Sequence, residues 1–296
     1  MLKLILLFLL TTNNYIVCQP PYEPTWASLE TRSIPDWYRE LKFGIFIHWG
    51  VYSVPAYGCD NANAAEWYEH YLMDGRQCLL DFHAQNYGAE TPYREFASAF
   101  RAELFDPDKW ADLFQRSGAN YIVLTSKHHD GFALYDTPFS PNWNSVEVGP
   151  NRNLVGDLFD SMRKRTNMRL GLYHSLMEWS HPLYVSDIAN GTRNFPESHL
   201  LPMMRELVEK FNPDIVWSDG EWDRTYQYWG STQFLAWLYN ESPVRDHVVV
   251  NDRWDMNRPA QCERSCVHTV ESEAGGFDPD HIWEECRTMS NPLSWG

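Results

Sequence analysis

The sequence lacks the motifs and the charge that several large protein classes require. It contains neither a GxGxxG sequence nor a P-loop, which argues against a doubly wound nucleotide-binding fold. Basic residues are scarce, with 24 Lys and Arg against 40 Asp and Glu, so the formal net charge is −16. A surface this acidic argues against nucleic acids and anionic membranes as partners.

Long apolar runs are missing beyond the first residues of the chain. Lys3 precedes a short apolar run over 4–10, which is the pattern of a secretory signal peptide. The run is too short to span a bilayer. We therefore expect a signal peptide over 1–18 and a soluble mature chain over 19–296, whose net charge would change from −16 to −17 through the loss of Lys3.

The glycosylation sequons agree with entry into the secretory pathway. Asn190-Gly-Thr and Asn240-Glu-Ser are both acceptor sequences for N-linked glycans. Because such sequons also occur by chance, they add only modest support to the signal peptide. The expected location of the protein is lysosomal or extracellular.

Cysteine is also infrequent, and the spacing of its residues suggests disulfides. Five cysteines would remain after signal cleavage, namely Cys59, Cys78, Cys262, Cys266 and Cys286. In a secreted chain we expect Cys59 to pair with Cys78 and two of the other three to pair, leaving one over. Cys262 and Cys266 with His268 would be an alternative zinc site, although no second ligand pair has the usual structural spacing.

Aromatic residues are abundant, with 14 Trp, 16 Tyr and 15 Phe, which excludes disorder and suits stacking against sugars. Short apolar runs that end in polar residues alternate with segments of helical spacing. The runs cover 43–47, 121–125, 169–172, 214–217 and 248–250. The helical segments cover 93–118, broken at Asp106-Pro107, then 153–164 and 202–211.

Strands alternating with helices predict a parallel sheet of the α/β class. Reactive side chains at the carboxyl ends of successive strands are typical of a (β/α)8 barrel, which is the fold we expect. The segment 58–88 is a long insertion after the first strand and should form part of the rim over the site. We find no interdomain linker, low-complexity tract or internal repeat.

Asp219 is the candidate nucleophile. It ends an apolar strand between Trp217 and Trp222, where rigid backbone and indole faces would suit a sugar-cleaving site. An attacking carboxylate must be ionised, and Arg253, at the end of the next strand, could supply the cation that this requires. The alternative is that Ser218 or Asp219 only caps a following helix.

Three histidines, His48, His128 and His129, follow two of the predicted strands. Neutral imidazoles donate and accept hydrogen bonds, which suits sugar hydroxyls. A zinc site built from the three is a rival interpretation, and packed structural histidines are another. Glu66 and Trp67, in the long insertion, could bind a diol and stack on the sugar ring, unless Glu66 is simply an exposed loop residue.

A retaining glycosidase also needs a second carboxyl, with its carboxyl about 5–5.5 Å from that of the nucleophile. The candidates after Arg253 are Glu263, Glu271, Glu273 and Glu284. The residue pattern alone does not choose among them.

In several motifs the chain resembles the α-L-fucosidases of glycoside hydrolase family 29, in their animal lysosomal or secreted branch. The motifs are FGIFIHWGVYSVP (43–55), EWY (66–68), KHHDGF (127–132), NWNS (142–145), GLYHS (171–175), PDIVWSDGEW (213–222), NDRW (251–254), WEEC (283–286) and SWG (294–296). They run in order across nearly all of the mature chain, so the match is highly specific.

The resemblance implies a retaining exo-α-L-fucosidase that removes terminal fucose from glycoproteins or glycolipids through a fucosyl-Asp219 intermediate. It implies no metal or other cofactor, and it is compatible with a homo-oligomer. The fucose pocket it implies comprises His48, Glu66, Trp67, His128, His129, Tyr173, Arg253 and Trp295, the last on the methyl side of the sugar. It favours Glu271 as the acid/base, with Glu284 and then Glu273 as alternatives.

The chain departs from the family pattern after Ser-Trp-Gly, where members continue into further barrel elements and a C-terminal β-sandwich. We therefore expect a barrel that is incomplete at its C-terminus and lacks the β-sandwich. The alternative function is a non-catalytic fucose-binding paralogue that keeps the pocket. A further departure is the Cys262 to Cys266 segment, which replaces a glycine- and tyrosine-rich stretch.

Overall fold

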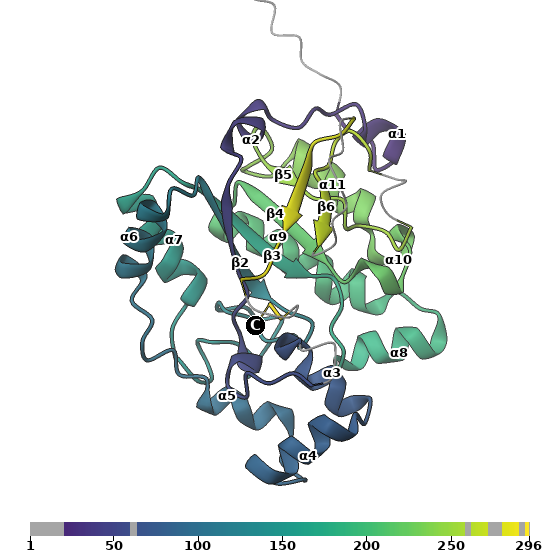
Figure 1. Ribbon diagram of the computed structural model, residues 1–296. Coiled ribbons are helices and arrows are strands. Elements are labelled where there is room, and N and C mark those ends of the chain that lie inside the picture. Colours follow the sequence, from purple (N-terminus) through teal and green to yellow (C-terminus); the bar gives the residue numbers. More distant parts are fainter. Residues whose placement is uncertain (1–20, 60–63, 258–261, 272–279, 290–293, 296) are drawn as a thin grey trace, which may run out of the picture.

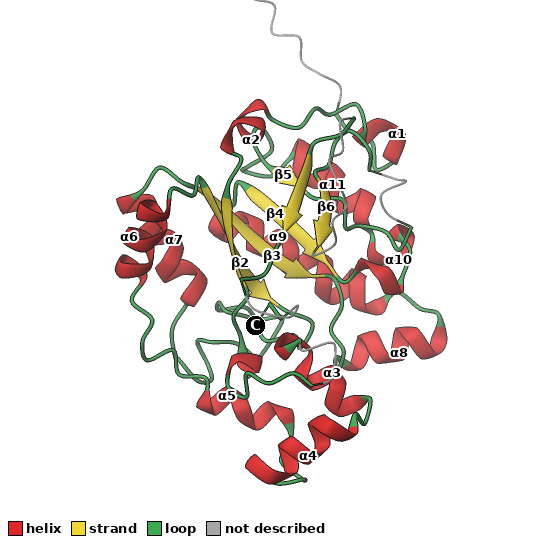
Figure 2. Ribbon diagram, in the orientation of Figure 1, coloured by secondary structure: helices red, strands yellow, loops and turns green. Residues whose placement is uncertain are grey.

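The computed structural model describes residues 21–59, 64–257, 262–271, 280–289 and 294–295. Parallel strands stand at its centre and helices surround them (Figures 1 and 2). The predicted signal peptide and Glu273 lie outside the described residues. Within the described part, no helix combines the length and the apolar character needed to cross a bilayer.

Five parallel strands pair in the order in which they occur along the chain. They are β1 (Gly44–Ile47), β2 (Tyr121–Lys127), β3 (Arg169–Ser175), β4 (Ile215–Asp219) and β5 (Val249–Val250). A parallel bridge from Asn251 to Val267 leads on to a second parallel pair, β6 (His268–Glu271) and β7 (Trp283–Cys286). Consecutive parallel strands in sequential order are the arrangement of a (β/α) barrel wall.

The helices lie on the outside of this wall, as βα crossovers require. In Figure 1, α6 (Pro107–Ser117) and α7 (Leu154–Arg165) lie on one side, and α8 (Pro182–Asn190) and α10 (Tyr226–Trp229) on the other. The remaining barrel helices are α9 (Leu201–Phe211) and α11 (Ser231–Asn240), with α1 (Trp26–Leu29) and α2 (Asp36–Leu41) preceding β1.

The long insertion after β1 is helical and lies below the carboxyl ends of the strands. It contains α3 (Tyr68–Met73) and α4 (Gln77–Asn86), followed by α5 (Phe96–Ala99) (Figure 1). A disulfide between Cys59 and Cys78 closes it, as predicted. Its position at that end of the barrel agrees with the expectation that it forms part of the rim.

The predicted break at Asp106-Pro107 is confirmed and has a clear local cause. The Asp106 side chain accepts a hydrogen bond from Lys109 N at 3.1 Å, which caps α6. Pro107 occupies the first helical position, where no backbone N–H is needed. The second disulfide joins Cys262 to Cys266 and leaves Cys286 as a buried thiol, so the two cysteines of the zinc alternative are not free thiolates.

Barrel strands have both faces covered, and β2 and β4 are buried along their whole length. Inside the barrel, aromatic and branched side chains pack together, among them Tyr121, Tyr173 and Trp217. Larger apolar clusters fill the space between the strands and the helices. This double burial explains why the strands read as continuous apolar runs in the sequence.

Gly220 turns the chain immediately after β4, and its surroundings leave no space for a side chain. Its φ of 80° lies in the left-handed region, which favours glycine. A Cβ atom at this position would lie 2.9 Å from Met177 Cγ and 3.3 Å from His129 Cε1. The turn after Asp219 therefore depends on glycine both for its backbone conformation and for close packing.

We expect Gly220→Ala to destabilise the fold by roughly 2–4 kcal/mol, because backbone strain and crowding both contribute. Gly75→Ala is the matched control, since Gly75 has a φ of 69° and no atom within 4 Å of the added Cβ. Backbone strain alone should cost this control about 1 kcal/mol. Urea denaturation of both variants measures the difference, and equal losses would contradict the crowding.

Candidate functional site

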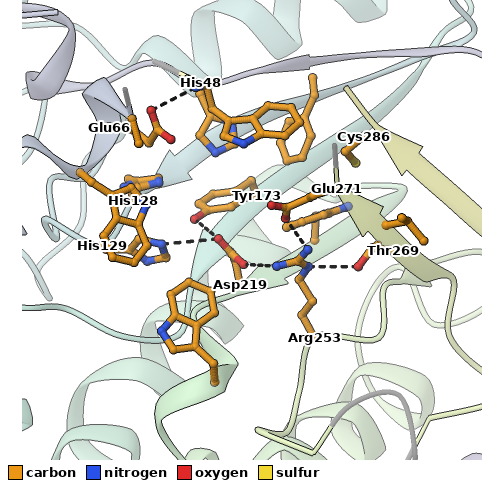
Figure 3. A pocket seen from close by; sticks show the side chains of 17 residues that line it. His48, Glu66, His128, His129, Tyr173, Asp219, Arg253, Thr269, Glu271 and Cys286 are labelled. Atoms are coloured by element: carbon orange, nitrogen blue, oxygen red, sulfur yellow. Dashed lines mark hydrogen bonds and ion pairs between the residues drawn. The ribbon is translucent and has the colours of Figure 1, made fainter. Parts of the chain in front are cut away.

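The carboxyl ends of the strands open into a cavity of about 680 Å³ that gathers most of the predicted site residues (Figure 3). Of these residues, ten line the cavity: His48, Glu66, Trp67, His128, His129, Tyr173, Asp219, Arg253, Glu271 and Trp295. They come from the carboxyl-terminal parts of six strands, β1 to β6, from the insertion and from the last described residues. The sequence therefore predicted a site that the fold does bring together.

Asp219 ends β4 and is 8% exposed. Arg253 Nη1 donates to its Oδ1 at 2.9 Å, Tyr173 Oη donates to its Oδ2 at 2.7 Å, and His129 Nε2 lies 3.5 Å from Oδ2 (Figure 3). Burial by itself raises the pKa of Asp219, but the charge of Arg253 and these other neighbours outweigh it and lower that pKa. The carboxylate is therefore ionised at neutral and mildly acidic pH.

Arg253 is held from several sides. Its Nε donates to Thr269 Oγ1 at 3.0 Å, and Thr269 in turn donates to Asp252 Oδ1 at 2.7 Å. Its Nη2 forms an ion pair with Glu271 Oε1 (Figure 3). One guanidinium thus joins the carboxylates of Asp219 and Glu271, with a separate nitrogen for each.

The three histidines stand together beside Tyr173. The ring centroids of His128 and His129 are 4.1 Å apart, and those of His48 and His128 are 5.4 Å apart. Burial is the main cause that lowers the pKa of His48 to about 3 and of His129 to about 4, and it holds that of His128 well below its usual value. All three imidazoles are therefore uncharged at neutral pH.

The hydrogen bonds of Ser175 fix the tautomer of His129. Ser175 Oγ donates its one proton to Met177 O at 2.8 Å, so it accepts from His129 Nδ1 at 2.6 Å. In the neutral ring, Nε2 then carries a lone pair. This nitrogen lies near Asp219, where it can accept a hydrogen bond from a ligand hydroxyl.

Glu66 anchors the last described residues against the site. Trp295 N donates to Glu66 Oε2 at 3.0 Å, and Ala65 N donates to Ser294 Oγ at 3.2 Å. Trp295 consequently lies next to His48, with ring centroids 5.8 Å apart. This docking supplies one aromatic wall of the cavity.

The remaining acid/base candidates lie elsewhere. Glu284 does not line this cavity, and its carboxylate accepts hydrogen bonds from Tyr38, Tyr121 and Trp217. Glu263 is exposed and bonds through its backbone N–H to Glu30. Glu271, on β6, is therefore the described candidate that shares the cavity with Asp219.

Five further lining residues were not predicted: Phe46, Ala64, Thr269, Val270 and Cys286. Phe46 lies two positions before His48 on β1, so the alternation of side chains along a strand could have indicated it. Thr269 and Cys286 belong to β6 and β7, which the sequence interpretation did not recognise as strands. Nothing in their local sequence pointed to the cavity.

One group of side chains in the described part of the chain has its metal-ligating atoms within 4.8 Å of one another, namely Glu178, His181 and His199. It does not include His48, His128 or His129, which the zinc alternative requires. Lys127 Nζ lies 2.8 Å from Glu178 Oε1, and both side chains are buried. An ammonium group thus already neutralises Glu178, and it would repel a metal cation placed there.

The predicted glycosylation sites differ in their surroundings. Asn190 is exposed at the end of α8. Asn240 is half-buried, and its amide exchanges two hydrogen bonds of 2.8 Å with the backbone of Tyr22. Glycosylation at both asparagines remains a prediction.

Comparison with known proteins agrees with this geometry. A family model described as Alpha-L-fucosidase matches residues 9–296. Human tissue alpha-L-fucosidase is 48% identical over 301 residues, covering 100% of this chain and 62% of that protein. Human plasma alpha-L-fucosidase is 45% identical over 282 residues, covering 93% of this chain and 58% of that protein.

Among solved structures, Thermotoga maritima alpha-fucosidase in complex with fucose superposes with a TM-score of 0.73 at 35% identity. The match covers 89% of this chain and 61% of that one. The chain therefore spans about three fifths of the length of these relatives. The predicted (β/α)8-type barrel is confirmed, and the chain belongs to the α-L-fucosidase family.

Proposed function

We propose that the protein is a retaining exo-α-L-fucosidase that hydrolyses terminal α-L-fucose on glycoproteins or glycolipids. The observation that carries the proposal is the pair of carboxyl groups, Asp219 and Glu271, that line one cavity and contact one guanidinium. Family membership and the fucose complex of a structural relative support the same substrate.

In the first step, an ionised Asp219 oxygen attacks the anomeric carbon of fucose as the bond to the leaving oxygen breaks. Glu271 gives its proton to that oxygen. In the second step, Glu271 takes a proton from water, the water oxygen bonds to the anomeric carbon, and the bond to Asp219 breaks. Two inversions release fucose with its configuration retained.

Glu271 needs its proton for the first step, whereas its ion pair with Arg253 uses the ionised form. Its side chain is 37% exposed, so it can exchange protons with solvent. We therefore infer that the Glu271 carboxyl separates from Arg253 when substrate enters. Arg253 then contacts only the carboxylate of Asp219, which must stay ionised in the same step.

The walls of the cavity suit a deoxyhexose. The lone pair on His129 Nε2 and the carboxylate of Glu66 can accept hydrogen bonds from sugar hydroxyls. Trp295 and Phe46, with ring centroids 6.3 Å apart, offer apolar surface for the methyl group that distinguishes fucose from most hexoses. None of these contacts requires a metal ion or an organic cofactor.

We also propose that the protein passes through the secretory pathway to the lysosome or the extracellular space. Two disulfides among the described residues support this, because disulfides persist in oxidising compartments. The apolar residues at the N-terminus support it as well.

Asp219→Ala should lower kcat on 4-nitrophenyl α-L-fucoside on the order of a thousand-fold or more, because it removes the attacking group. Azide should restore turnover in this variant and give β-fucosyl azide. Glu271→Ala should instead give α-fucosyl azide, since azide then attacks the fucosyl-enzyme from the opposite face. Chromatography and NMR of the products distinguish the two.

Asp246→Ala is the matched control, because the Asp246 side chain is 87% exposed, and it should retain the wild-type rate. Near-normal turnover by Asp219→Ala would reject the proposed nucleophile. Tight binding of fucose by the wild-type protein without any turnover would favour the non-catalytic fucose-binding alternative.

The acidic limb of the pH dependence of kcat/KM should report the ionisation of Asp219. Activity is present above the lowered pKa of Asp219 and is lost as pH falls through it. Arg253→Gln removes the largest influence that opposes burial, so the limb should move about 1–3 pH units upward. Arg253→Lys keeps the charge and should move it less, whereas an unchanged limb in Arg253→Gln would contradict this role.

A further inference from the structure

Glu284 lies on β7 beneath the cavity, and its carboxylate accepts an unusual number of hydrogen bonds. Tyr38 Oη and Tyr121 Oη each donate to Oε2 at 2.7 Å. Trp217 Nε1 donates to Oε1 at 3.1 Å, and the Cys286 thiol donates to the same oxygen at 3.2 Å. These donors come from α2, β2, β4 and β7, so one side chain ties four elements together.

Glu284 is not among the residues that line the cavity, and the register of β6 and β7 shows how it lies relative to those that are. Glu271 pairs with Cys286, which lines the cavity, whereas Glu284 pairs with Thr269 two residues earlier. Alternate residues of a strand share a face, so Glu284 points to the same side as Cys286 but one step deeper in the barrel. With donors on both oxygens, it is not placed to protonate a leaving group.

Trp217 connects Glu284 to the residues around Asp219. The guanidinium carbon of Arg253 lies 4.9 Å from the centroid of the Trp217 ring. The Tyr173 ring stacks on the same indole, with centroids 5.7 Å apart and an interplanar angle of 23°. Arg253 and Tyr173 both donate hydrogen bonds to the carboxylate of Asp219.

We propose that Glu284 is a positioning residue, which fixes the Trp217 indole so that Arg253 and Tyr173 hold the Asp219 carboxylate in its attacking position. The inference rests on the proposed function, because it assigns Asp219 the attacking role. Tyr38 and Tyr121 keep their protons and so remain hydrogen-bond donors to Glu284. Burial is the main cause that raises the pKa of each tyrosine well above its usual value, and the charge of Glu284 raises it further.

Glu284→Gln tests the proposal with nearly unchanged shape. The amide has one acceptor oxygen, so it places an N–H group either against Trp217 Nε1 or against the two tyrosine hydroxyls. We expect kcat on 4-nitrophenyl α-L-fucoside to fall about ten- to a hundred-fold, with KM changed by less than about three-fold, since transition-state contacts are lost. The acidic limb of kcat/KM should move to higher pH as Arg253 loses its fixed place.

Tyr121→Phe is the second variant and removes one hydrogen-bond donor to Glu284 without changing any residue that lines the cavity. Tyr121→Phe should lower kcat by about two- to five-fold. It should also move the acidic limb of kcat/KM to higher pH, but by less than Glu284→Gln does. The double variant should lose less than the product of the two single effects, because both act through the same carboxylate. Tyr121→Phe also keeps the test open if Glu284→Gln does not fold.

The outcomes separate this inference from the proposed function. If Asp219→Ala and Glu271→Ala behave as expected while Glu284→Gln only lowers the melting temperature, the positioning role is wrong and the proposed function stands. If azide restores turnover in Glu284→Ala and yields α-fucosyl azide, Glu284 is the acid/base and the inference is overturned. A wild-type rate and pH profile in Glu284→Gln would overturn it equally.

Discussion

The structure of the site depends on one guanidinium between two carboxylates. Two carboxylates in one cavity repel each other, and their surroundings decide which of them takes up a proton. Arg253 contacts Asp219 through Nη1 and Glu271 through Nη2, and its charge lowers the pKa of Asp219, so that Asp219 is the acid that stays ionised. The arrangement requires β4, β5 and β6 to follow one another in the wall, so the sequential strand order is itself a condition for the chemistry.

Much of the fold could be predicted because β2 to β5 are buried almost throughout on both faces, and β1 is half-buried. Such strands appear as short apolar runs, and each ends where polar side chains begin, as at Lys127 or Asp219. Helices that carry an apolar stripe, such as α6 and α9, could be predicted from the sequence equally well. By contrast, α11 was not predicted from the sequence. Eight of its ten residues are buried, so it lacks the polar face whose repeat along the sequence reveals a helix.

The choice of the acid/base could not be made from the residue pattern, because β6 and β7 do not look like strands. His268-Thr-Val-Glu and Trp283-Glu-Glu-Cys carry charged residues where a buried run would be apolar. Only the pairing of Glu271 with Cys286 shows which glutamate reaches the cavity and which lies one step below it. The resemblance to a family favoured Glu271, and the sheet register agrees with that choice because it places Glu271, and not Glu284, at the cavity.

The docking of the 294–295 segment on Glu66 has a consequence for biosynthesis. The two contacting residues are 229 positions apart, so the segment between them must leave the ribosome before they can meet. Closing a loop of that length costs about 5 kcal/mol of chain entropy, which the earlier-formed barrel must already have reduced. A nascent chain can therefore assemble its central strands while the aromatic wall beside His48 is still absent, and this wall of the cavity is completed only after those strands have formed.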